Sequence, residues 1–189
     1  LPGSYFRDKS ISKKEMIETY LSIGELQKDD VDFFIIETMS SIDEAVNAVE
    51  ALSNFNKNIL ICFCLSEGDG TKLFSGEDLS KACDLIQIDK ISGLCLNCSQ
   101  FEDISKGLDI LKRYDLPYGA LPNNFQSVKP LKLGMSVDNI KKRNDILIED
   151  FVNYSNIWLK KGCTILGGCC EITPDLSLIH ISEPTRPLG

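Results

Sequence analysis

The sequence lacks several features that define whole classes of protein. Its longest uninterrupted apolar run, residues 59–65, is far shorter than the roughly 20 residues of a membrane-spanning helix, so no membrane partner is expected. Lysine and arginine number 20 against 28 aspartates and glutamates in 189 residues, which gives a net charge of −8. Binding of nucleic acid or anionic lipid needs clustered positive charge, so the composition argues against both partners.

The N-terminus also lacks two common features. No methionine opens the chain, which suggests a fragment, and residues 1–9 contain no apolar segment of a secretory signal. Several of the eight cysteines lie inside apolar runs, such as Cys62 and Cys64 in ILICFCL. Buried free thiols behave as small hydrophobic side chains and are typical of a reducing compartment. The sequence therefore predicts a cytoplasmic protein.

Near-continuous apolar runs alternate with helical stripes along the chain. The runs have the pattern of strands buried on both faces of a parallel sheet, and they span 31–38, 59–66, 93–98, 116–122 and 163–170. Four helix starts carry a serine followed three residues later by an acid, the pattern of a capping box. These pairs are Ser12 with Glu15, Ser41 with Glu44, Ser75 with Asp78, and Ser99 with Glu102.

Repeated strand–helix units build either an open doubly wound sheet or a closed (β/α)8 barrel. No GxGxxG motif follows any of the predicted strands, so the sequence lacks the usual evidence for an open dinucleotide-binding sheet. Five strands are too few for a whole barrel, which implies roughly three missing units ahead of the first residue. The predicted fold class is α/β, an incomplete (β/α)8 TIM barrel.

Four predicted strands end in reactive or polar side chains. The carboxyl ends of parallel strands meet at one mouth, where the active sites of such barrels are assembled. The residues at these ends are Glu37 and Thr38, then Cys98, then Asn123 and Asn124, and finally Cys169 with Cys170.

The adjacent cysteines are the most informative of these residues. Gly167 and Gly168 precede them and permit backbone angles that break the strand alternation, so both sulfurs can aim at one point. A third thiolate from Cys98 would make a three-thiolate site for zinc, with the fourth position open for substrate. A substrate thiol bound there would be deprotonated, which favours alkyl transfer to sulfur. By spacing alone, two ordinary core thiols fit the cysteine pair equally well.

At these residues the sequence resembles the homocysteine S-methyltransferases, zinc-dependent barrels that make methionine. The resemblance spans about residues 3–175 and is carried by four segments. They are DFFIIETMSSIDEA at 32–45, GLCLNC at 93–98, PYGALPNN at 117–124 and GGCCEITPD at 167–175.

The resemblance implies a function and a set of site residues. Cys98, Cys169 and Cys170 would be the zinc ligands, Glu37 would hold the amino group of homocysteine, and Asn123 would have a supporting role. The visible strands would be numbers four to eight, and residues 1–175 the C-terminal portion of a homocysteine-binding barrel domain. The family's N-terminal Asp-Gly-Gly segment is absent. Related enzymes use S-methylmethionine, S-adenosylmethionine, betaine or a methylated cobalamin as methyl donor. The short, freestanding character of this region favours a sulfonium donor, S-methylmethionine or S-adenosylmethionine.

Other interpretations stay open at this point. Glu37 also fits a cap of the next helix, since the positive N-terminus of a helix favours an acid. Zinc could instead staple a structural module without catalysis, although this predicts a fourth protein ligand and none is obvious near the strand ends. The chain could also be an inactive truncated barrel with an exposed strand edge. Residues 176–189 depart from the family pattern and resemble read-through sequence, and their His180, the one histidine, is expected to be incidental.

Overall fold

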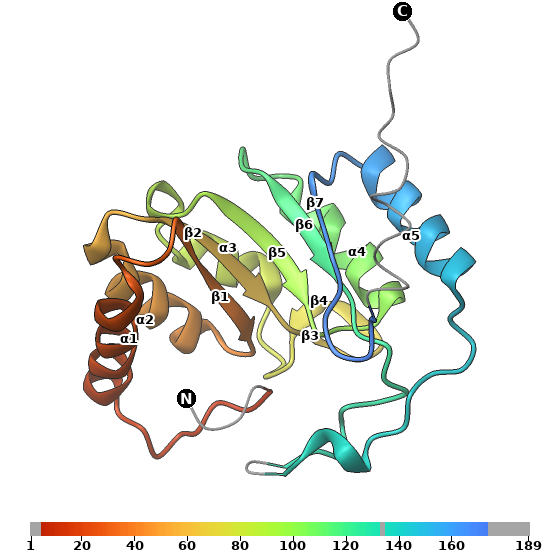
Figure 1. Cartoon of the computed structure of the whole chain (residues 1–189), viewed down its shortest axis with the longest axis horizontal. Helices are drawn as coiled ribbons and strands as arrows, with labels where there is room; N and C mark the ends of the chain where they lie inside the picture. The colour runs from red at the N-terminus through yellow and green to blue at the C-terminus, as the bar shows by residue number, and fades with distance from the viewer. Residues whose placement is uncertain (1–4, 133–134, 174–189) are drawn as a thin grey trace, which may run out of the picture.

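A computed structural model describes residues 5–132 and 135–173 (Figure 1). At its centre is a five-stranded sheet in the order β1-β2-β5-β6-β7, in which all neighbouring strands are parallel. The strands are β1 (Phe33–Met39), β2 (Asn58–Phe63), β5 (Gly93–Asn97), β6 (Tyr118–Leu121) and β7 (Ile165–Leu166). The helices are α1 (Lys13–Gln27), α2 (Ile42–Leu52), α3 (Leu79–Leu85), α4 (Phe101–Leu111) and α5 (Ile148–Lys160). This order confirms the predicted α/β fold with a parallel sheet.

The helices lie on one face of the sheet and leave the other face uncovered (Figure 1). Side chains alternate along a strand, and on β1 the residues that point towards the helices, Phe34 and Ile36, are only 5% and 3% exposed. The intervening Phe33 and Ile35 are 46% and 48% exposed. β1 is also an edge strand of the sheet. No helix in the described ranges is long and apolar enough to span a membrane.

The apolar faces of the helices pack as predicted, and α5 is an example. Trp158 is fully buried and stacks on Phe101 of α4 with ring centroids 5.9 Å apart. Its indole nitrogen donates to the Ser105 hydroxyl over 2.8 Å, so the one polar atom of the ring is satisfied. Phe151 meets the same Phe101 ring edge-on at 5.9 Å. This aromatic cluster attaches α5 to α4.

Only the first of the four predicted capping boxes forms. Ser12 and Glu15 exchange the two expected hydrogen bonds at the start of α1. At the other three helix starts, the serine instead contacts a different group. Ser41 donates to Asp43, Ser75 donates to Glu77, and Ser99 accepts from the Leu65 backbone N–H. The pattern of serine and acid therefore located the helices but not their capping contacts.

Two predicted strands are shorter than expected. The run 59–66 divides at Cys64, where Leu65–Ser66 (β3) pairs with Asp69–Leu73 (β4) in an antiparallel hairpin that the sequence analysis did not predict. The run 163–170 forms a strand only over β7. Beyond it, the Cys169 N–H donates to the carbonyl of Pro122, so the chain turns across the end of β6. Three short 3-10 turns, Ser53–Phe55, Ile88–Lys90 and Val137–Asn139, complete the described elements.

Candidate metal centre

Cys98 directly follows β5, at the end of the sheet where the other strands also finish. It has a left-handed backbone with φ of 47°, which ends the strand, and its N–H donates to the carbonyl of Leu121 over 3.1 Å. A left-handed backbone is uncommon for a residue with a Cβ, so the local fold imposes this conformation. The side chain is 4% exposed. The first cysteine is therefore rigidly held.

The two adjacent cysteines are held by the segment that follows β6. The Cys169 N–H donates to Pro122, and the Asn124 N–H donates to the carbonyl of Cys170 over 3.0 Å. A Cβ on Gly168 would lie 2.3 Å from the Ile172 side chain, so this glycine permits a close approach. The left-handed residue of the turn is Glu171, with φ of 62°. Both cysteines are half-buried.

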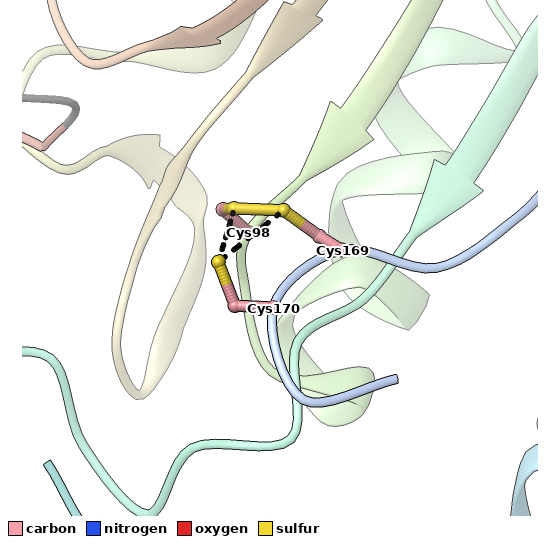
Figure 2. Close-up of side chains that lie close together, drawn as sticks. All are labelled: Cys98, Cys169 and Cys170. Carbon is pink, nitrogen blue, oxygen red and sulfur yellow. Dashed lines mark hydrogen bonds between the residues drawn. A yellow bond between two sulfur atoms is a disulfide. The ribbon is translucent and has the colours of Figure 1, made fainter. Parts of the chain in front are cut away.

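The three sulfurs meet at one point, as Figure 2 shows. Cys98 and Cys169 form a disulfide, with their Cα atoms 5.4 Å apart. The Cys170 sulfur lies 3.8 Å from that of Cys98 and 3.9 Å from that of Cys169. Sulfurs bound to one tetrahedral zinc at 2.3 Å are about 3.8 Å from each other. The two distances from the Cys170 sulfur therefore already fit a shared zinc ion. The Cys98 and Cys169 sulfurs can reach this separation only after the disulfide is reduced.

The donor set also fits a soft metal ion. Cys98, Cys169 and Cys170 form a group that could hold a metal, with their sulfurs all within 4.8 Å of one another. Burial raises the pKa of the Cys170 thiol, so a nearby cation would be needed to hold this sulfur as a thiolate at neutral pH. Within residues 5–132 and 135–173 no fourth histidine, cysteine or carboxylate joins the group. The three predicted ligands thus come together without a fourth protein donor among the described residues.

Glu37 lies on the uncovered face of β1 and is exposed. Its negative charge reaches two cysteines. The pKa of Cys170 is raised by burial and, to a lesser degree, by Glu37. The pKa of Cys62 is raised by a hydrogen bond with Cys95, by burial and by the same carboxylate. The first N–H of α2 is bound by Glu77 over 3.1 Å, so the described contacts do not support Glu37 as a helix cap.

A clamp beside Glu37 was missed by the sequence analysis. Thr38 has a left-handed backbone with φ of 60° where the pairing of β1 with β2 shifts register. Asn97 at the end of β5 accepts from the Thr38 N–H and donates to its hydroxyl. The sequence contained a hint of this contact, because Asn97 belongs to the GLCLNC segment. Its partner Thr38 lies 59 residues away, so no local pattern links the two residues. The clamp fixes the backbone next to Glu37.

Asn123 is 2% exposed, and its side-chain oxygen accepts from the Phe125 N–H over 3.3 Å. Asn123 is therefore buried next to Asn124, whose N–H holds the Cys170 carbonyl. Its amide interacts with the hydroxyl of Tyr5, a residue that the sequence analysis also missed. Tyr5 packs in a small apolar cluster with Cys98, and Cys170 lies against that cluster. His180 lies outside the described residues.

Comparison with known sequences gives one consistent result. A family model described as Homocysteine S-methyltransferase matches residues 2–181. Homocysteine S-methyltransferase 2 of Zea mays is 31% identical over 156 residues, which cover 79% of this chain and 43% of the relative. Selenocysteine methyltransferase of Astragalus bisulcatus is 26% identical over 151 residues, covering 77% of this chain and 42% of the relative. The chain thus spans less than half the length of these relatives.

Solved structures show the same fold. The metallated homocysteine methyltransferase MmuM of Escherichia coli superposes with a TM-score of 0.67 at 22% identity, over 92% of this chain and 52% of that protein. The oxidized form of the same protein superposes with a TM-score of 0.68 at 20% identity. The match covers 95% of this chain and 56% of that protein. The match confirms the predicted fold, because the parallel sheet corresponds to about half of a (β/α)8 barrel.

Proposed function

This chain belongs to the homocysteine S-methyltransferase family, and we propose that the complete protein transfers a methyl group to the thiol of homocysteine, giving methionine. The donor in this proposal is a sulfonium compound, S-methylmethionine or S-adenosylmethionine. The observation that carries the proposal is the meeting of the Cys98, Cys169 and Cys170 sulfurs without a fourth ligand from the described residues. Three thiolates with a free fourth position suit a substrate that is itself a thiol.

Zinc is the proposed cofactor, held by Cys98, Cys169 and Cys170. Bound there, it would keep the homocysteine sulfur as a thiolate, the nucleophilic form. The substrate sulfur then forms a bond to the methyl carbon, and the sulfonium sulfur of the donor keeps the electron pair of the broken bond. The donor leaves as a neutral thioether, and the thiol proton has already passed to solvent.

Glu37 is proposed to hold the ammonium group of homocysteine. Its carboxylate is exposed on the uncovered face, and its charge reaches the Cys170 sulfur. An ammonium at this position would be bound by a charge-assisted hydrogen bond while the thiol points to the sulfurs. The clamp of Thr38 by Asn97 keeps the Glu37 backbone in place. Asn123 is proposed to have a supporting role, since it is buried and its side-chain oxygen holds the Phe125 N–H.

A structural zinc site and an inactive fragment are the alternatives. A structural site normally closes its fourth position with a protein ligand. Across the described ranges the sulfur group contains no fourth ligand, which favours the catalytic interpretation. An inactive fragment would hold zinc without turnover. We propose that residues 1–175 are the C-terminal portion of the barrel domain and that its catalytic form includes the missing strands.

The test is methionine formation by the complete, reduced, zinc-loaded protein with homocysteine and each donor. We expect turnover with at least one sulfonium donor. Glu37→Gln should raise KM for homocysteine, since it removes the charge that pairs with the ammonium, whereas Glu50→Gln, at an exposed position of α2, should not. Zinc binding without methionine formation from either donor would contradict the proposal.

A further inference from the structure

The hydroxyl of Tyr5 is buried without a regular hydrogen bond. The residue is 4% exposed, and its ring lies against Phe74 with centroids 5.8 Å apart. Within the described part of the chain its oxygen has no partner of good geometry. A buried polar group left unpaired destabilises the fold, so such a group calls for an explanation.

Two polar side chains nevertheless interact with this hydroxyl. One is the Asn123 amide, and the other is the thiol of Cys170, which packs against the same apolar cluster as Tyr5. The Asn123 oxygen is already engaged by the Phe125 N–H, which leaves the amide nitrogen to face Tyr5. A neutral thiol is a weak acceptor, whereas a thiolate accepts strongly. A thiolate at Cys170, formed when the sulfur binds a metal, would therefore supply the partner that the Tyr5 hydroxyl lacks.

We propose that Tyr5 is a positioning residue of this centre, whose hydroxyl donates a hydrogen bond to the Cys170 thiolate while its oxygen accepts from the Asn123 amide. The proposal rests on the proposed function, because Cys170 becomes a thiolate by binding the metal. A phenol keeps its proton at neutral pH, so the Tyr5 hydroxyl remains a donor. The phenol ring, fixed by Phe74, sets the direction of the bond.

This hydrogen bond has a consequence for specificity. Four sulfurs would share the centre during the reaction, three from the protein and one from homocysteine, and only the last should accept the methyl group. A hydrogen bond withdraws electron density from the Cys170 sulfur and makes it a poorer nucleophile. Tyr5 would thus protect a ligand from alkylation and leave the substrate sulfur as the most reactive.

The test uses the complete protein loaded with cobalt(II), whose absorption reports on sulfur ligands. In Tyr5→Phe we expect the sulfur-to-cobalt charge-transfer band to keep its intensity and move to lower energy, because the sulfur loses a stabilising hydrogen bond. We also expect iodoacetamide to alkylate metal-bound Cys170 roughly tenfold faster, the effect of one hydrogen bond to a charged group. The matched control is Tyr20→Phe, which removes a hydroxyl 3.9 Å from the Met39 sulfur, away from the centre.

A second variant covers the case in which Tyr5→Phe does not fold. A fluorinated tyrosine at position 5 is a stronger donor of nearly the same shape, and the band should move to higher energy. Unchanged band energy and alkylation rate in the variants would overturn the role of Tyr5 and leave the metal centre intact. Absence of any charge-transfer band in the unmodified protein would overturn the metal centre itself, and this proposal with it.

Discussion

Asn97 at the end of β5 holds Thr38 at the end of β1, although β2 lies between their strands. The Asn97 oxygen accepts from the Thr38 N–H over 3.0 Å, and its amide donates to the Thr38 hydroxyl over 2.9 Å. Both side chains are buried, and Thr38 has a left-handed backbone. The two hydrogen bonds therefore support a strained turn that carries Glu37.

Removing this clamp should destabilise the fold. In Asn97→Ala the buried N–H of Thr38 loses its partner, and we expect a loss of about 1–3 kcal/mol in the free energy of unfolding. Urea denaturation of the reduced protein measures it. Asn58→Ala is the control, since that exposed side chain makes one contact with Ser92 and its loss should cost about 0.5 kcal/mol or less. Equal losses in the two variants would contradict the role of the clamp.

The hairpin of β3 and β4 should be sensitive to a single methyl group. A Cβ on Gly70 would lie 2.1 Å from the carbonyl oxygen of Asp103, and a backbone atom on α4 cannot move aside cheaply. We expect Gly70→Ala to lose about 1–3 kcal/mol of stability through overpacking. Lys72→Ala on the same strand removes only a surface ion pair with Asp78, so it should change stability little. Comparable unfolding midpoints for both variants would count against this packing.

An acidic pH should weaken the contact between α4 and the loop before α5. Arg143 donates two hydrogen bonds to Glu102, which lowers the pKa of that carboxyl below its usual range. A lowered acid pKa stabilises the fold above the unfolded pKa, and this contribution is lost as pH falls through the folded value.

Glu102→Gln should therefore cost at most about 1 kcal/mol at neutral pH, since the pair is partly exposed. Its difference from the unmodified protein should shrink as pH falls below about 4.3. Unfolding curves over a pH series measure this, with the exposed Glu149→Gln as the comparison. A difference that stays constant with pH would rule out the ion pair as its cause.

Metal uptake should depend on the redox state of the cysteines. Cys98 and Cys169 form a disulfide in the structure, and bonded sulfurs cannot both serve as thiolate ligands. We expect stoichiometric zinc binding after reduction and little binding after oxidation with diamide. Cys83→Ala, in the buried face of α3, should behave like the unmodified protein in both states. Full zinc binding by the oxidised protein would contradict the assignment of Cys98 and Cys169.

The sequence allowed the site to be located because strand ends converge. Cys98 and Cys170 could be placed together without knowing any contact, since parallel strands finish at one edge of a sheet. Local signals were weaker guides to detail. Ser99 has the capping pattern, yet its hydroxyl binds Leu65 of the hairpin because that distant N–H is buried beside it. Tyr5 and the Asn97 clamp depend on contacts between distant segments, which no local pattern encodes.

Cys98, Cys169 and Cys170 are proposed to bind one zinc and to leave a position for the thiol of homocysteine. X-ray absorption at the zinc edge of the complete, reduced protein tests this most directly. We expect the spectrum to show three sulfur ligands on zinc in the free protein and a fourth sulfur ligand when homocysteine is added. Fewer than three sulfurs, or no additional sulfur with homocysteine, would contradict it.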